Sequence, residues 1–298
     1  MSIDIYAVEE LLTGAVDLYV HAAPDLLPRA SDDAGVAMGL QTARLQTAIH
    51  RHHFEATGGR SRHAREATGF DLRGAIILNT PAGALDPAAT ERALREGVAW
   101  VGLPTLSAQH CRPQLNGLPA AALALLDAGD GGIRLLDAHN ELRGEVNEIF
   151  ALVAQHGAVL GLGYGDFDEI HAAARASQAA GVKHRVLTYP RLSGLADTQI
   201  TALLDIPGTW LELCGYGIHP HGAARDWRAA QQDFFHLLTL AGTRRCLLSS
   251  DGGMLGCLPP HQLLQWSCGQ LLEAGLTHDE VTRLIKTNPR AILEEKFS

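Results

Sequence analysis

Two groups of histidines and tyrosines follow short apolar segments near the start of the chain. Tyr19 and His21 end the run DLYVH, and His50, His52 and His53 end the run AIHRHH. Residues two apart point to the same face of a strand, so each group can present two side chains to one place. Imidazoles together with a carboxylate are typical ligands of zinc, manganese or iron, and such a metal can activate water. Because the chain holds 15 histidines, one of them alone is more often a packing or surface residue.

Polar residues at later positions extend this candidate site. Asp251 follows the apolar run CLLSS and precedes two glycines, and Glu212 lies inside the run TWLELC. A carboxylate at a strand end can bind a metal or act as a general base, although Asp251 could instead cap the next segment. The loop GIHPH carries His219 and His221, which either reach the site or lie exposed.

Short apolar segments alternate with longer amphipathic segments along the chain. Near-continuous apolar character over a few residues is typical of parallel strands that are buried on both faces. This character predicts strands at 15–20, 44–50, 75–78, 99–103, 158–162, 185–188, 209–213 and 246–249. Helical spacing predicts helices at 88–96, 144–155, 167–180, 197–204 and 227–240. Tyr164 and Tyr189 follow the fifth and sixth predicted strands.

Strand–helix units that follow one another without a linker favour an α/β fold, a (β/α)8 TIM barrel. An open doubly wound sheet is the rival, but DLYVHAAPD lacks the Gly-rich phosphate turn expected after its first strand. The segments 259–274, 277–286 and 289–295 predict extra C-terminal helices. We therefore expect one domain over residues 1–298, with its site at the C-terminal ends of the strands.

Composition and charge restrict the partners and the compartment. The net charge is −9, and no basic stripe is present, so we expect no nucleic-acid partner. The first residues lack the basic start of a signal peptide, and no apolar run is long enough to predict a membrane span. The five cysteines include no CxxC pair, which is typical of reduced thiols in the cytoplasm. We expect a cytoplasmic enzyme with a small-molecule substrate and, on general frequency, a homo-oligomer.

Several motifs occur in a definite order: DLYVHAAPD, AIHRHHF, DPAATERAL, VLGLGYGDFDEI, RVLTYPR, LLSSDGG and LIKTNPRAIL. Their order over nearly the whole chain resembles that of amidohydrolase-superfamily barrels, in a branch with phosphotriesterase-like and dihydroorotase-like relatives. The resemblance implies one or two metals, held by a His-x-His after the first strand, histidines after strands five and six, and an Asp after strand eight. His21 matches the second His of the first motif. Asp251 matches the last-strand Asp, for which the resemblance implies the role of general base.

Tyrosines stand at three positions where the resemblance implies histidine ligands. These are Tyr19, Tyr164 and Tyr189, and His50 stands where relatives often have lysine. A phenol has a pKa of about 10, so neutral tyrosine is a poor zinc ligand. Tyrosines at these three ligand positions predict an altered metal site.

The first hypothesis is a hydrolase that acts on a small amide, lactone or ester, with an altered metal site. The expected ligands of one zinc, manganese or iron ion are His21, His50, His52 and Asp251. The expected catalytic residues are Asp251, Tyr19, Tyr164 and Tyr189. The expected substrate-binding residues are His53, Glu212, His219 and His221.

Two other hypotheses stay open at this point. One is a metal-free lyase, isomerase or decarboxylase, in which the tyrosines and histidines carry out acid–base chemistry. The other is a non-catalytic barrel that binds a small molecule, since tyrosines offer flat amphipathic surfaces.

Overall fold

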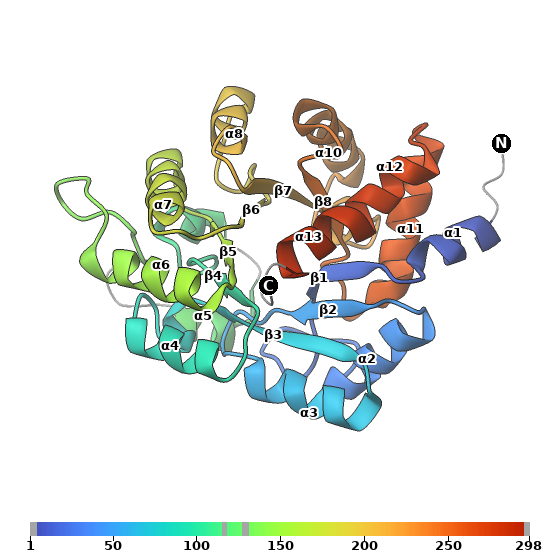
Figure 1. The fold of residues 1–298 in the computed structure, drawn as a ribbon, viewed down its shortest axis with the longest axis horizontal. Helices are drawn as coiled ribbons and strands as arrows, with labels where there is room; N and C mark the ends of the chain where they lie inside the picture. Colours follow the sequence, from blue (N-terminus) through green and yellow to red (C-terminus); the bar gives the residue numbers. More distant parts are fainter. Residues whose placement is uncertain (1–4, 115–117, 127–130, 295–298) are drawn as a thin grey trace. The chain divides into compact units, whose positions relative to one another are not determined.

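The structure, a computed structural model, describes residues 5–114, 118–126 and 131–294. Eight parallel strands pair in the order of the sequence and alternate with helices (Figure 1). The strands are β1 (Val16–Val20), β2 (Thr47–His50), β3 (Asp71–Ile77), β4 (Trp100–Gly102), β5 (Val159–Gly161), β6 (Arg185–Thr188), β7 (Thr209–Cys214) and β8 (Cys246–Ser249). The chain therefore has a (β/α)8 barrel fold, which confirms the fold predicted from the apolar segments.

Helices lie between the strands and after the last one. They are α1 (Ile5–Leu12), α2 (Asp33–Thr42), α3 (Gly58–Thr68), α4 (Pro87–Arg95), α5 (Ala120–Leu126), α6 (Gly144–His156), α7 (Phe167–Ala179), α8 (Asp197–Leu204), α9 (Gly215–Ile218), α10 (Trp227–Ala241), α11 (Pro260–Glu273), α12 (His278–Thr282) and α13 (Asn288–Glu294). Short 3-10 turns occupy Thr80–Ala82 and Gln109–Gln114, and a π-helical turn, Arg283–Thr287, joins α12 to α13.

The amphipathic pattern does not predict α2 or α3. Helix α2 buries only Val36, Ala37 and Leu40, so its apolar stripe is narrow. Helix α3 is mainly polar, with the sequence GGRSRHAREAT. Strand β2 begins at Thr47, later than predicted, because Arg44 adopts a positive φ of 60° in the preceding turn.

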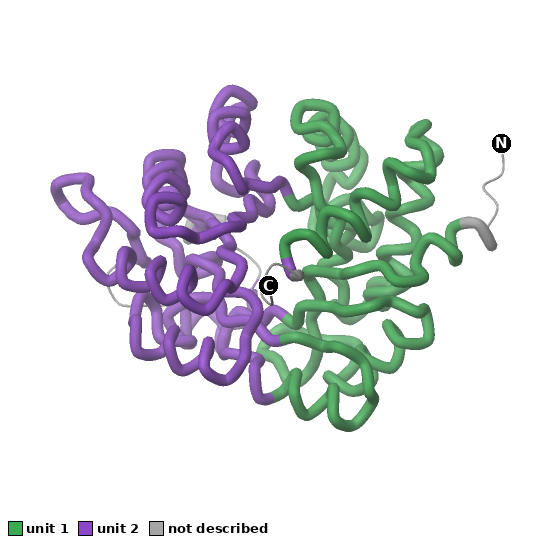
Figure 2. Tube along the Cα trace, viewed as in Figure 1, with its two compact units in different colours: residues 1–50, 60–73, 212–292 green, residues 51–59, 74–211, 293–298 purple. Residues whose placement is uncertain are grey.

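The chain divides into two compact units (Figure 2). The first holds residues 1–50, 60–73 and 212–292. Within it, β1 pairs with β2, and every residue of both strands is buried. A parallel bridge between Val20 and Gly252 places the chain after β8 next to the end of β1.

The second unit holds residues 51–59, 74–211 and 293–298. Within it, β3 pairs with β4, β4 with β5 and β5 with β6. The buried indole of Trp100 packs over Gly161 of the neighbouring strand, where an added Cβ would lie 2.9 Å from the indole Nε1. The single domain over residues 1–298 stays a prediction.

Among the described residues, no helix combines the length and the apolar character needed to cross a membrane.

Candidate active site

The first unit brings His21 and Asp251 together at the C-terminal ends of β1 and β8. His21 directly follows β1, and Asp251 lies two residues beyond β8. The His21 N–H donates to the Gly252 carbonyl at 2.8 Å, and the Asp251 N–H donates to the Tyr19 carbonyl at 2.9 Å. His21 Nε2 then lies 3.1 Å from Asp251 Oδ1, and both side chains are more than 90% buried. Two residues 230 positions apart, which the sequence indicates for different reasons, thus bring an imidazole and a carboxylate into contact.

The turn that carries Asp251 has an unusual backbone. Asp251 has φ +51° and Gly253 has φ +121°, both in the left-handed region. A Cβ on Gly253 would lie 2.1 Å from the His21 carbonyl oxygen, so a side chain there would push the two segments apart. Left-handed backbone costs a non-glycine residue roughly 1–2 kcal/mol, and such strain is frequent at functional sites. The turn therefore holds Asp251 against His21 at some cost in stability.

Asp17 and Ser250 add hydrogen bonds between the end of β1 and the chain after β8. Asp17 is fully buried, and its Oδ1 accepts the N–H groups of Tyr19 at 3.1 Å and Ser250 at 3.0 Å. The Ser250 hydroxyl donates to the Tyr19 carbonyl at 3.1 Å and accepts the Gly252 N–H at 3.0 Å. Burial, aided by the Glu212 carboxylate, raises the pKa of Asp17 to about 7. These contacts fix the backbone on both sides of the His21–Asp251 pair.

Tyr19 and Glu212 lie inside the first unit rather than on its surface. The Tyr19 ring centroid is 5.1 Å from that of His21, and Tyr19 is 4% exposed. Glu212 is 1% exposed, and its Oε1 accepts the Ser249 hydroxyl at 2.7 Å. Tyr19 is therefore placed to orient the His21 ring, whereas Glu212 lies in the core.

His50 pairs with a second carboxylate, that of Asp33. His50 Nδ1 lies 3.3 Å from Asp33 Oδ1. The Arg60 guanidinium donates to both oxygens of Asp33 at 2.9 Å, and it also donates to the Pro24 carbonyl at 3.0 Å. Asp33 and Arg60 were missed in the sequence because they lie on α2 and α3, whose apolar patterns are weak. An aspartate pair at 32–33 before a helix was the one available signal, since Asp32 caps α2.

The loop after β7 supplies His219 and two residues that the sequence did not single out. His219 is 7% exposed, and its ring centroid lies 4.8 Å from that of Trp266. His221 is exposed. Tyr216 is half-buried at the start of this loop. Burial raises the pKa of Tyr216, and the Asp251 carboxylate raises it further. Tyr216 therefore lies in the electrostatic field of Asp251 and keeps its phenolic proton at neutral pH.

His52 and His53 lie in the second unit. His52 Nδ1 accepts the Phe54 N–H at 3.1 Å. His53 Nδ1 lies 3.2 Å from the Thr105 hydroxyl, and the Asn79 amide donates to the His53 carbonyl at 3.0 Å. Asn79 Oδ1 also accepts the Thr105 N–H at 2.9 Å. Asn79 thus links the chain beyond β2 to the chain beyond β4.

Tyr164 and Tyr189 also lie in the second unit. Tyr164 is 5% exposed, and its N–H donates to the Pro104 carbonyl at 2.9 Å. Tyr189 is half-buried and has φ +50°, a left-handed conformation like that of Asp251. Their assignment as catalytic residues stays a prediction.

The described side chains do not complete a metal centre. Among residues 5–114, 118–126 and 131–294, no three His, Cys, Asp or Glu side chains converge on one position. His21 and Asp251 offer two donors, whereas His50 faces Asp33, which also binds Arg60. Zinc takes at least three protein ligands even at an open catalytic site. The residues as placed do not fit such an ion, and the four-ligand set His21, His50, His52 and Asp251 stays a prediction.

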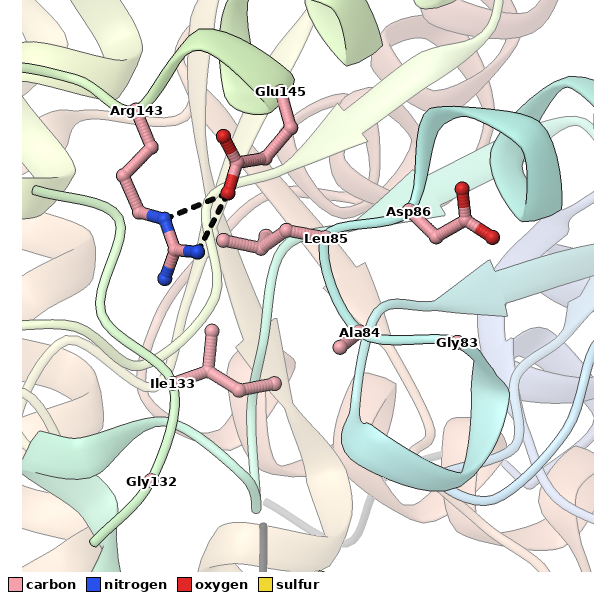
Figure 3. A pocket seen from close by; sticks show the side chains of 8 residues that line it. All are labelled: Gly83, Ala84, Leu85, Asp86, Gly132, Ile133, Arg143 and Glu145. Carbon is pink, nitrogen blue, oxygen red and sulfur yellow. Dashed lines mark hydrogen bonds and ion pairs between the residues drawn. The ribbon is translucent and has the colours of Figure 1, made fainter. Parts of the chain in front are cut away.

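A cavity of about 320 Å³ lies elsewhere in the second unit (Figure 3). Leu85 and Ile133 form apolar walls, and at one edge Arg143 Nη2 lies 2.6 Å from Glu145 Oε1. Asp86 lines the cavity as well, so its lining carries two carboxylates and one guanidinium. None of the predicted site residues lines it.

Comparisons with known proteins agree with the fold. A model described as a family of unknown function (DUF6282) matches residues 14–212, and no curated protein sequence matches significantly. An amidohydrolase from Pseudomonas aeruginosa is 9% identical, with 99% of each chain covered and a TM-score of 0.64. A variant of a phosphotriesterase-like lactonase from Deinococcus radiodurans is 14% identical, with 98% of this chain and all of that chain covered, and a TM-score of 0.57. These structures share the barrel that the sequence resemblance implied, and the branch stays a prediction.

Gly253→Ala tests the close approach of the Asp251 turn to His21. Gly256 is the matched control, because it also has a positive φ of 87° but no atom within 4 Å of its added Cβ. We expect Gly256→Ala to lower the free energy of unfolding by about 1 kcal/mol through backbone strain. Gly253→Ala adds a steric clash with the His21 carbonyl and should lower the free energy of unfolding by about 3 kcal/mol. Urea unfolding measures both, and equal losses would contradict the close packing.

Asp17→Asn tests the buried carboxyl group. The folded state holds the Asp17 proton up to about pH 7, whereas the unfolded chain releases it near the ordinary aspartate pKa of 3.8. Stability is therefore full below that value and falls as the pH rises to about 7, by roughly 4 kcal/mol. Asparagine keeps the Oδ1 acceptor but does not titrate, so this part of the pH dependence should disappear.

The measurement is urea unfolding between pH 4 and 8. Asp86→Asn, at the exposed start of α4, serves as the control and should keep the wild-type profile. An unchanged profile in Asp17→Asn would show that the native state does not hold a proton on this carboxyl.

Proposed function

The chain belongs to the family of unknown function DUF6282, and we propose that it is a hydrolase of small esters, lactones or amides. The His21–Asp251 pair would activate the attacking water. The observation that carries this proposal is the 3.1 Å separation of His21 Nε2 and Asp251 Oδ1 at the C-terminal ends of β1 and β8. Active sites of barrel enzymes lie at this end of the strands.

The geometry defines a role for each partner. If His21 Nε2 carries a proton, it donates to the Asp251 carboxylate, and Nδ1 is left with a lone pair. Nδ1 can then take a proton from water while the water oxygen attacks the substrate carbonyl. Asp251 stabilises the imidazolium that forms, as the carboxylate does in a catalytic His–Asp pair. The imidazolium proton passes to the leaving oxygen or nitrogen as its bond to carbon breaks.

Tyr216 is the candidate donor to the carbonyl oxygen. Burial and the Asp251 carboxylate raise its pKa, so the phenol stays protonated and able to donate. A hydrogen bond aimed at the developing negative charge typically contributes about 3 kcal/mol to lowering the barrier. Tyr216 is half-buried, so a substrate can reach it.

The barrel fold supports a hydrolase, because structures described as an amidohydrolase and a lactonase share it. The roles of Tyr164, Tyr189 and His53 toward the substrate stay predictions, as do the cytoplasmic location and the homo-oligomeric state. Binding of zinc, manganese or iron by the predicted set His21, His50, His52 and Asp251 is the second candidate, because imidazole and carboxylate are suitable donors.

Asp251→Asn and His21→Asn test the proposed base. Each should lower kcat by about 10²–10⁴-fold, because asparagine at 21 cannot accept the proton and asparagine at 251 cannot stabilise the imidazolium. Asp33→Asn is the matched control, since it alters the other His–Asp pair, and its kcat should stay within a few-fold of wild type. The assay uses a panel of small esters, lactones and amides. Full activity in His21→Asn would rule out the proposed base.

Chelation separates the two candidates. We expect the enzyme dialysed against a strong chelator to keep its kcat, because the described residues offer only two donors at His21 and Asp251. Activity that disappears on dialysis and returns with stoichiometric zinc, manganese or iron would favour the metal-bound site instead. Metal analysis of the untreated and dialysed protein is the control.

A further inference from the structure

Cys257 and His219 form a thiol–imidazole pair that the proposed hydrolysis does not use. Cys257 Sγ lies 3.5 Å from His219 Nδ1. His219 directly follows α9, and Cys257 lies in the segment between β8 and α11. Both belong to the first unit.

The backbone fixes which nitrogen of His219 faces the thiol. The His221 N–H donates to His219 Nδ1 at 3.1 Å. A backbone N–H can only donate, so Nδ1 is the unprotonated nitrogen of the neutral ring and Nε2 carries the hydrogen. The Trp266 ring packs edge-to-face against the His219 ring, with 4.8 Å between the ring centroids, and restrains the orientation of His219. The Cys257 thiol and the His221 N–H therefore both face the lone pair of Nδ1 in an oriented imidazole.

The ring is also in the right state to accept a proton. Burial lowers the pKa of His219, and the His221 imidazole lowers it further, so the ring is neutral at pH 7. Burial raises the pKa of Cys257, and the Asp251 carboxylate adds to this. The thiol is therefore protonated at pH 7 and needs a base in order to act as a nucleophile.

Cys257 differs from the other cysteines in its accessibility. It is partly exposed, whereas Cys111, Cys214, Cys246 and Cys268 are buried. A small electrophile can therefore reach Cys257 before it reaches the others. A nucleophile within reach of a base that a third group orients is the arrangement found in covalent acyl transfer.

We propose that Cys257 is a nucleophile that accepts an acyl group from an ester, with His219 as its base. The Sγ–carbon bond forms as the thiol proton moves to His219 Nδ1, which gives up its hydrogen bond from the His221 N–H as it takes the proton. The bond between the carbonyl carbon and the ester oxygen then breaks, and the leaving alcohol takes the proton from His219. The products are a thioester on Cys257 and an alcohol, and no oxidant or reductant is needed. This site goes beyond the proposed function, in which water attacks without a thiol.

Acetylation by p-nitrophenyl acetate at pH 7 tests the pair. The mass of the modified peptide, followed over time, gives both the rate and the site, because hydrolysis of the ester would also release nitrophenol. We expect one acetyl group on Cys257 in the wild type and none in Cys257→Ser at that position. His219→Asn keeps a polar atom near the place of Nδ1 but accepts no proton, so acetylation should slow by about 100-fold or more. His278→Asn is the control, because His278 is exposed at the start of α12, and its rate should stay near that of the wild type.

Two further measurements keep the test decisive. His21→Asn should still acetylate at Cys257 even though it removes the proposed water-activating base, so the two proposals can fail separately. If His219→Asn does not fold, the wild-type rate in D2O replaces it, and transfer of the thiol proton to His219 predicts slower acetylation than in H2O. Equal rates in wild type and His219→Asn, or no solvent isotope effect, would overturn the proposal. Failure of the ester to acetylate Cys257 while iodoacetamide alkylates it would also overturn it, since the thiol would then be exposed but not activated.

Discussion

Hydrogen bonds between the chain at the end of β1 and the chain after β8 set the geometry on which the candidate site depends. The carbonyl of Tyr19 accepts the Asp251 N–H, and the carbonyl of Gly252 accepts the His21 N–H. Asp17 and Ser250 add side-chain bonds to the same two segments. The two functional side chains therefore meet because of backbone pairing, and their own hydrogen bond is a consequence of it. A shift of either segment would separate them without altering either residue.

Three aspartates of the first unit lie in different electrostatic environments. Asp251 faces an imidazole, and Asp33 faces both an imidazole and a guanidinium. Asp17 accepts two backbone N–H groups, and burial raises its pKa to about 7. Burying an ionised carboxylate costs little free energy only when the group is paired or hydrogen-bonded. The same chemical group thus serves as a charged partner at one position and as a proton-holding support at another.

The sequence predicts the strands well, and it predicts the residues that directly follow them. Runs such as CLLSS are apolar because both faces of the strand are buried, and His21 and Asp251 stand out because they interrupt that pattern. The weakly amphipathic α2 and α3 carry no comparable signal, so Asp33 and Arg60 were missed. The choice of Asp33 as partner of His50 depends on a contact between distant elements, which local spacing does not encode. Tyr216 lies in the short helix α9 and Cys257 lies in a loop, and a single polar residue in either has no apolar pattern to interrupt.

The tautomer of His21 tests the central claim most directly. Nitrogen-15 NMR of histidine-labelled protein, with His21→Asn used to assign the signal, distinguishes a protonated ring nitrogen from an unprotonated one. The account predicts that the neutral His21 ring carries its proton on Nε2, donated to Asp251, with Nδ1 unprotonated and available as the base. A ring protonated on Nδ1, or one whose Nε2 signal disappears when a chelator is removed and metal is added, would contradict it.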